Sequence, residues 1–277
     1  MSPLVVGLLI TAAVLHATWN AILRSGADRL WSITVISAVG ALVALPFALA
    51  LPKPDLAAWP YLALSAILQI GYCLFLVRAY RDGHLAHVYP IARGTAPLLV
   101  TLGAAVFAGE HLRLPGLAGV ALVSGGIMIL GLGKDRPDGR STGAALAAGA
   151  FIASYMVCDG VGVRTSHHAT GYAAWQAVCQ GATMVPVYWA IRRRPPDVPK
   201  GVAGARVVAA AIIGVFSYCV VVWAMSFSPM GQVSALRETS ILFAALIGAV
   251  FLHERITLRR LLGAAVIASG AICLSAL

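Results

Sequence analysis

Apolar runs long enough to cross a lipid bilayer follow one another along almost the whole chain, with only a few residues between them. The run LVVGLLITAAVL is continuously apolar, whereas strands of an outer-membrane barrel alternate apolar and polar residues. A helix of ~20 residues spans the ~30 Å hydrocarbon core of a bilayer. We therefore expect ten membrane-spanning helices, at residues 3–23, 30–51, 58–80, 84–109, 114–133, 141–162, 169–191, 204–227, 231–251 and 257–277.

The scarcity of charged residues agrees with a lipid surrounding. They make up 11% of the chain, against about 25% in soluble domains, so they are too few to cover a surface that faces water. The loops between the runs are short, which makes neighbouring helices antiparallel. The sequence therefore predicts an all-α integral membrane protein, with the lipid bilayer as its partner.

The charges that are present indicate how the chain is oriented. A formal charge of +10 in a soluble protein would suggest a nucleic-acid partner. Here most of the 20 lysines and arginines lie in alternate loops, those after the first, third, fifth, seventh and ninth helices. Basic loops stay in the cytoplasm when helical membrane proteins insert. We expect no nucleic-acid partner, a bacterial-type inner (plasma) membrane location and both termini on the non-cytoplasmic side.

Two halves of the sequence resemble each other. GEHLRLPGLAGVALVSGG (109–126) matches HERITLRRLLGAAVIASG (253–270), and ARGT (92–95) matches LRET (236–239), with every pair offset by 144 residues. The glycines that match in the first pair of segments are two helical turns apart, which suits close packing between helices. The sequence therefore predicts two repeats of five helices.

The odd number of crossings makes the second repeat enter the membrane upside down. VRAYRDGH (77–84) carries two arginines, whereas its counterpart WAMSFSPMG (223–231) carries none. Opposite charge bias in related segments is typical of inverted repeats. We place the first repeat at residues 1–133 and the second at residues 134–277, within one membrane domain.

The motif that ends each half carries a family resemblance. The segments E-H-L-R-L-P-G-L-A-G and E-R-I-T-L-R-R-L-L-G, together with Trp19-Asn20 near the end of the first helix, resemble the drug/metabolite transporter superfamily, specifically its EamA-like branch. The resemblance covers nearly the whole chain. It implies a secondary transporter, often an exporter of amino acids, other metabolites or drugs, and the chain looks most like the YddG-type amino-acid exporters. Tyr155-Met156 replaces Trp19-Asn20 in the second half, so we expect the halves to differ in substrate contact.

Four ionisable residues lie inside expected helices, namely Arg93, Asp159, Arg237 and Glu238. A charge at the centre of a lone membrane helix costs ~2.5–3.5 kcal/mol, so these side chains should face a cavity or one another. Arg93 and Arg237 are equivalent in the two repeats, which would bring both towards the membrane midplane, where inverted-repeat transporters bind substrate. Asp159 and Glu238 are the candidates for proton coupling.

Arg93 stands between Pro90 and Pro97, which remove backbone donors, and next to Gly94. A helix weakened there would leave carbonyl groups for Arg93 to bind. The same guanidinium is suited to hold an anionic group of a substrate. A third interpretation is that it braces the helix or pairs with Asp159 or Glu238, and the sequence leaves these alternatives open.

Aromatic and polar side chains inside the expected helices suit the lining of a cavity for a small amphipathic solute. Together with the buried charges they form the predicted substrate site. Its residues are His16, Trp19, Asn20, Tyr89, Arg93, Tyr155, Trp175, Gln176, Tyr218, Arg237 and Glu238. Glu110 and Glu254 precede helices and are interpreted as caps rather than as transport residues.

The main alternative to a transporter, from another functional class, is an intramembrane enzyme. Neither G-x-S-x-G nor H-E-x-x-H occurs, and the five cysteines show no metal-ligand spacing. We expect no enzyme, no cofactor and no metal. A channel or a receptor-like protein remains a weaker alternative.

The sequence therefore predicts a transporter that exports small metabolites, amino acids first among them, by alternating access. The carboxylate of an amino acid would meet Arg93 and its ammonium would meet Glu238, Asn20 or backbone carbonyls. The alternative substrates are lipophilic cationic drugs or other metabolites, with Asp159 or Glu238 supplying the charge for a cation. The oligomeric state is left open, and a monomer is compatible with the sequence.

Overall fold

The computed structural model describes the chain except for residues 23–27, 83–84, 132–138, 198–200, 252–256 and 277. The described residues are almost entirely helical and contain no strand. A short 3₁₀ turn, Leu56–Ala58, precedes the third long helix. The α-helices are α1 (Pro3–Ile22), α2 (Arg29–Ala50), α3 (Trp59–Asp82), α4 (Leu85–Ala108), α5 (Leu114–Gly131), α6 (Gly139–Thr165), α7 (Ala169–Arg192), α8 (Gly201–Met225), α9 (Met230–Glu238), α10 (Ser240–Phe251) and α11 (Leu258–Ser275).

These helices form the ten expected spans, and α9 and α10 together make the ninth. Among the described residues, 8 helices are long and apolar enough to be recognised as spans one by one. The expected single helix at 231–251 is interrupted at Thr239. The Thr239 hydroxyl donates to the carbonyl of Leu236 at 2.6 Å, and its backbone N–H donates to the same oxygen at 3.1 Å. That carbonyl is the one that Ser240 N–H would use in a continuous helix.

α4 is not interrupted at Pro90 and Pro97, where the sequence suggested a weakened helix, and it stays helical through both. The hydroxyls of Thr95 and Thr101 donate to carbonyls of the same stretch, at 2.8 Å each. These bonds go to Ile91 and Pro97 rather than to the carbonyls four residues before each proline, so they do not replace the hydrogen bonds that the prolines lack. The break lies instead in the equivalent segment of the second repeat.

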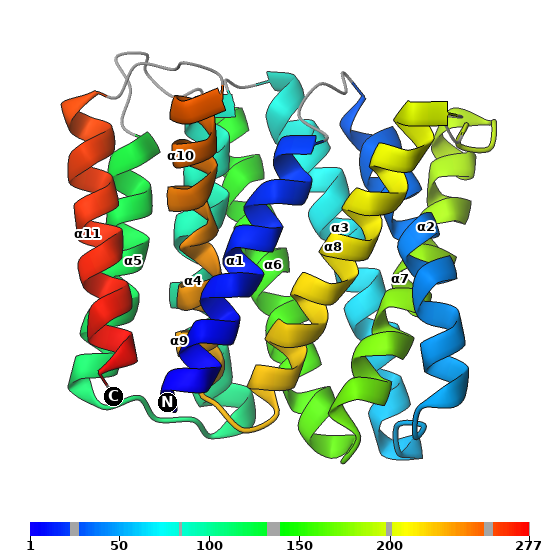
Figure 1. The fold of residues 1–277 in the computed structure, drawn as a ribbon, viewed down its shortest axis with the longest axis horizontal. Helices are drawn as coiled ribbons and strands as arrows, with labels where there is room; N and C mark the ends of the chain where they lie inside the picture. Colours follow the sequence, from blue (N-terminus) through cyan, green and yellow to red (C-terminus); the bar gives the residue numbers. More distant parts are fainter. Residues whose placement is uncertain (23–27, 83–84, 132–138, 198–200, 252–256, 277) are drawn as a thin grey trace.

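The first helix of each half packs into the other half. α1 lies against α8, α9 and α10, and α6 lies against α3 and α4. Two further extensive contacts join equivalent spans, with α5 against α11 at one side of the bundle and α2 against α7 at the other (Figure 1). Exchanging the two halves therefore maps these contacts onto one another, as expected for inverted repeats.

The matching glycines bring α5 and α11 close together. A Cβ added at Gly126 would lie 2.9 Å from the carbonyl oxygen of Gly263, and one added at Gly270 would lie 2.9 Å from that of Gly119. The backbones of the two helices therefore touch where larger side chains would hold them apart.

Both termini lie at one end of the bundle, which we call the termini end (Figure 1). α1 therefore runs from the termini end to the opposite end, and each following span reverses direction. The orientation of these two ends relative to the cytoplasm stays a prediction from the charge distribution.

Candidate functional site

A cavity of about 1080 Å³ lies between the two halves of the bundle. α1, α2, α4, α5, α10 and α11 line it with residues from their parts nearer the opposite end, such as Asn20, Ser32 and Leu130. Arg259 and Arg260, at the start of α11, line its mouth. The cavity therefore extends from the middle of the bundle towards the opposite end.

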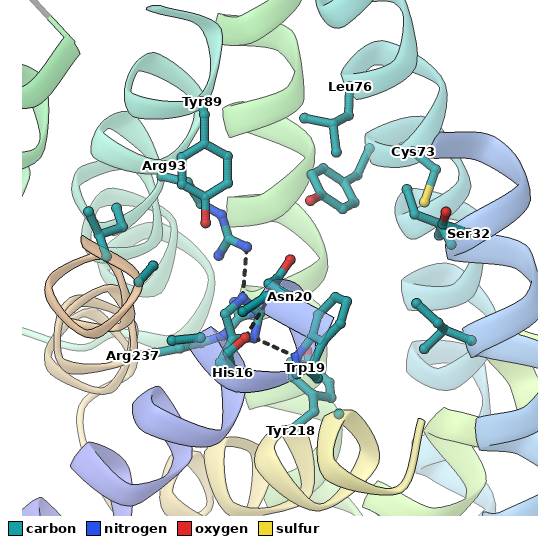
Figure 2. A pocket seen from close by; sticks show the side chains of 18 of the residues that line it. His16, Trp19, Asn20, Ser32, Cys73, Leu76, Tyr89, Arg93, Tyr218 and Arg237 are labelled. Carbon is teal, nitrogen blue, oxygen red and sulfur yellow. Dashed lines mark hydrogen bonds between the residues drawn. The ribbon is translucent and has the colours of Figure 1, made fainter. Parts of the chain in front are cut away.

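Aromatic rings and amides form much of the wall. Tyr155 lies between Tyr72 and Tyr218, with ring centroids 6.1 and 6.4 Å away. Trp19 on α1 and Tyr89 on α4 complete the aromatic lining (Figure 2). The amides that line the cavity are those of Asn20, Gln69, Gln176 and Gln180. A large apolar wall with a few polar groups is typical of sites for small amphipathic solutes.

An ion pair links the two halves at the floor of the cavity. Arg93 lies on α4, and Glu238 is the last residue of α9. Arg93 Nη1 donates to Glu238 Oε1 at 2.9 Å and to Glu238 Oε2 at 3.3 Å. The Glu238 side chain is 0% exposed, because Arg93 covers it from the cavity. Of the partners that the sequence allowed for Arg93, Glu238 is the one observed.

His16 on α1 holds the other side of the same guanidinium (Figure 2). Its Nε2 lies 2.9 Å from Arg93 Nη2, and its Nδ1 lies 3.3 Å from Trp19 Nε1. Guanidinium groups only donate, so Nε2 must accept and the imidazole must be neutral, with its proton on Nδ1. Trp19 Nε1 and His16 Nδ1 then both carry hydrogen, so their approach is a packing contact rather than a hydrogen bond.

Arg237 also points into the cavity, yet it is held differently. In the described part of the chain, its Nη1 lies 3.5 Å from the sulfur of Met156 and 4.0 Å from Glu238 Oε1. Its guanidinium lies 5.5 Å from the centre of the Tyr218 ring. The residue is 6% exposed. Two buried guanidiniums therefore face one buried carboxylate, and the carboxylate is bonded to Arg93.

Asp159 lies behind the wall rather than in it. The hydroxyls of Tyr218 and Tyr172 donate to its two oxygens at 2.6 and 3.1 Å. Its carboxylate is fully buried, and neither arginine of the floor is bonded to it. Tyr218 lines the cavity, so it connects Asp159 to the space where a solute would lie.

All of the candidate substrate residues except Trp175 and Glu238 line the cavity. Trp175 was expected in the wall, but its ring packs on Trp59, with centroids 5.0 Å apart. The sequence-based list missed Tyr72, Gln69 and Gln180. The two glutamines are isolated amides within apolar helices, which is the signal that identified Gln176.

The termini end is closed beneath the floor. Every residue of α9 is buried, and this helix runs from the termini end up to Glu238. Arg164, at the end of α6, donates to the carbonyls of Met225 and Ser228 at 2.9 and 2.8 Å. It also forms an ion pair with Glu110 of the α4–α5 connection.

Glu110 has a capping role, as expected, but at a different helix. Its Oε2 accepts a hydrogen bond of 2.9 Å from the backbone N–H of Met230, the first residue of α9. It therefore caps a helix of the other half rather than α5, which follows it in the chain. Its counterpart Glu254 lies outside the described residues.

The sequence profile of the EamA-like transporter family matches residues 3–132 and, a second time, residues 141–276. The chain belongs to the EamA-like transporter family. Each match covers one five-helix half. The protein is therefore a multi-pass membrane transporter of the drug/metabolite type, which implies a small-molecule substrate.

A solved crystal structure has the same fold as this EamA-like protein. It superposes with a TM-score of 0.77 over 98% of this chain and 94% of that chain, at 21% sequence identity. At this identity the likeness concerns the fold alone. No curated protein matches the chain.

Proposed function

We propose that the protein exports small metabolites, amino acids first among them, by alternating access through the cavity between its halves. The observation that carries this proposal is the cavity itself. Both repeats contribute to it, arginines lie at its floor, and it is closed towards one end of the bundle. Secondary transporters with inverted repeats place their substrate at such a position.

The cavity chemistry favours a carboxylate-bearing solute. A carboxylate meets guanidinium groups at the floor, and a side chain meets aromatic walls. Lipophilic cations are the second candidate class, and they require an accessible anion. Asp159 and Glu238 are both fully buried, and no aspartate or glutamate among the described residues lines the cavity. A cation would have to break the Arg93–Glu238 pair, so we favour carboxylate-bearing solutes, amino acids among them.

The closed termini end gives the structure a place in the transport cycle. With the opposite end in the cytoplasm, as the basic loops predict, the cavity is open to the compartment from which an exporter loads. Asp159 and Glu238 stay the candidates for proton coupling, since each is a buried carboxylate that contacts a residue of the cavity lining.

Transport into proteoliposomes tests this function. Purified protein is reconstituted, and uptake of radiolabelled amino acids is compared with that of protein-free liposomes. We expect uptake to saturate and to be accelerated by the same unlabelled amino acid on the other side. Arg194→Gln, which changes an exposed loop residue, is the control and should behave as wild type.

Other outcomes identify other functions. Flux that rises linearly with concentration and shows no trans-stimulation would indicate a channel. Uptake of a lipophilic cation by folded protein that takes up no amino acid would favour the second class of substrate.

A further inference from the structure

We propose that Arg237, rather than Arg93, binds the anionic group of the substrate, and that the cavity therefore binds organic anions more tightly than zwitterions such as amino acids, and both more tightly than cations. The inference rests on the proposed function in one respect, that the cavity is the transport site. It names the charge of the preferred substrate and the group that recognises it.

The first step is that Arg93 is already occupied. Its Nη1 donates to both oxygens of Glu238, and its Nη2 donates to His16 Nε2. Arg93 lines the cavity, but its charge is already neutralised by Glu238, so a substrate carboxylate that took the place of Glu238 would separate a buried ion pair. Removing one partner from a buried pair leaves an uncompensated charge, which is strongly unfavourable.

The second step is that the positive charge of Arg237 is not balanced by a carboxylate of its own. Within the described residues it has a sulfur acceptor at 3.5 Å, and thioether sulfur is a weak acceptor. Glu238 is 4.0 Å away and is committed to Arg93. A cation that is 94% buried and lacks a bonded anion calls for one, and a solute in the cavity can supply it.

Helix geometry also explains why Glu238 is hydrogen-bonded to Arg93 and not to Arg237, its neighbour in sequence. Adjacent residues on a helix point in different directions and do not face each other. Glu238 is therefore bonded to Arg93 on α4, while Arg237 lines the cavity with its guanidinium 5.5 Å from the centre of the Tyr218 ring. Figure 2 labels both Arg237 and Tyr218.

The third step concerns the rest of the lining, which offers nothing of opposite sign. Four arginines line the cavity and, in the described ranges, no carboxylate does. The ammonium of a zwitterion would meet only amide and phenol oxygens there, for example those of Asn20 and Gln69. A monocarboxylate with an aromatic body uses the arginine and the aromatic walls and leaves no charge unpaired.

Three probes with the same ring and different charge test the proposal. These are phenylacetate, phenylalanine and phenethylamine, an anion, a zwitterion and a cation. Binding to the full-length protein in detergent is measured by titration calorimetry, and stability without ligand by thermal unfolding. We expect phenylacetate to bind most tightly and phenethylamine most weakly.

The variants separate binding from bracing. Arg237→Gln should weaken phenylacetate binding about 10- to 100-fold, the value of a hydrogen bond to a charged group. It should leave the unfolding temperature of the empty protein unchanged or raise it, because it removes an unbalanced charge. Arg237→Lys keeps the charge without the planar fork and should retain part of the affinity. Arg194→Gln is the control for an exposed arginine.

Three results would overturn the inference. They are tighter binding of phenethylamine than of phenylacetate, unchanged phenylacetate binding in Arg237→Gln, and a clear loss of stability or folding in that variant, which would make Arg237 a bracing residue. Phenylalanine uptake without phenylacetate binding refutes this inference and leaves the proposed function standing. Phenylacetate binding that depends on Arg237, without any amino-acid uptake, supports the inference and refutes amino-acid transport.

Discussion

Replacing Arg164 with glutamine should release the closed termini end of the transporter. Arg164 joins the end of α6 to the α8–α9 connection through two carbonyl groups, and to the first half through its ion pair with Glu110. Glu110 in turn caps α9. For the cavity to open at this end, α6 must separate from the α8–α9 connection, so these bonds stabilise the present conformation relative to the alternative one.

The size of the effect follows from the bonds that are lost. A hydrogen bond to a charged group contributes ~1.5–3 kcal/mol when buried, and exposed ion pairs contribute less than about 1 kcal/mol. The Arg164 side chain is 30% exposed, so we take about 2–3 kcal/mol for its interactions together. That free energy corresponds to a shift of ~30- to 150-fold in the equilibrium between the two conformations.

A reporter cysteine between the floor and the termini end measures this shift. Ser234 on α9 is one turn from Arg237, is fully buried and contacts the sulfur of Met156. In a background without the five natural cysteines, Ser234→Cys is treated with a membrane-impermeant maleimide added from the termini side. We expect labelling to be slow in this parent and ~30- to 150-fold faster with Arg164→Gln, in proportion to the open population.

The control removes an ion pair of the same type from the opposite end. Arg192 on α7 bonds to Asp28 at 2.6 Å, and its side chain is 45% exposed. Arg192→Gln should leave the labelling rate of the reporter unchanged. Equal labelling of the Arg164→Gln variant and the parent, with both proteins folded, would show that the Arg164 interactions do not hold this end closed.

Two further predictions concern stability, measured by unfolding in detergent. Glu238→Gln leaves two buried guanidiniums without a carboxylate and should cost about 3–5 kcal/mol; adding Arg93→Met should recover part of this loss, whereas a fully additive double variant would contradict the pairing. Gly126→Ala places a methyl group 2.9 Å from the carbonyl oxygen of Gly263 and should cost about 1–3 kcal/mol. Gly125→Ala, which meets no atom within 4 Å, is its control and should be nearly neutral.

The spans and their inverted arrangement were predictable because lipid imposes strong demands on sequence. Backbone polar groups in lipid must be hydrogen-bonded within the segment, which requires helices. The side chains that face lipid must be apolar, so each span is a long apolar run in the sequence. The repeat was readable because its motifs recur at one offset. Most polar residues of the cavity could also be predicted, because an isolated amide or guanidinium in a membrane helix needs a polar surrounding.

The sequence left the partner of Arg93 open between Asp159 and Glu238, and the break at Thr239 was not expected. The sequence places Arg237 next to Glu238, but side-chain direction on a helix makes the distant Arg93 the partner. Two prolines made α4 the expected weak point, yet α4 is continuous and contains threonine-to-carbonyl hydrogen bonds such as that of Thr95. The interruption lies in the ninth span, at Thr239, whose hydroxyl bonds to the carbonyl of Leu236. Both outcomes depend on which atoms meet in three dimensions, and one-dimensional spacing does not contain that information.

The exchange of first helices between the halves has a consequence for biosynthesis. The packing partners of α1 are α8, α9 and α10, which are the last parts of the chain to be made apart from α11. Glu238 follows Arg93 by 145 residues, which takes about 7 to 30 s at a synthesis rate of ~5–20 residues per second. During that interval α4 carries an arginine without its carboxylate, at a cost of ~2.5–3.5 kcal/mol in the membrane. In the newly inserted first half α4 can already pack on α5, but α1 has its partners only after α8, α9 and α10 are made, so the bundle is completed when nearly the whole chain has been synthesised.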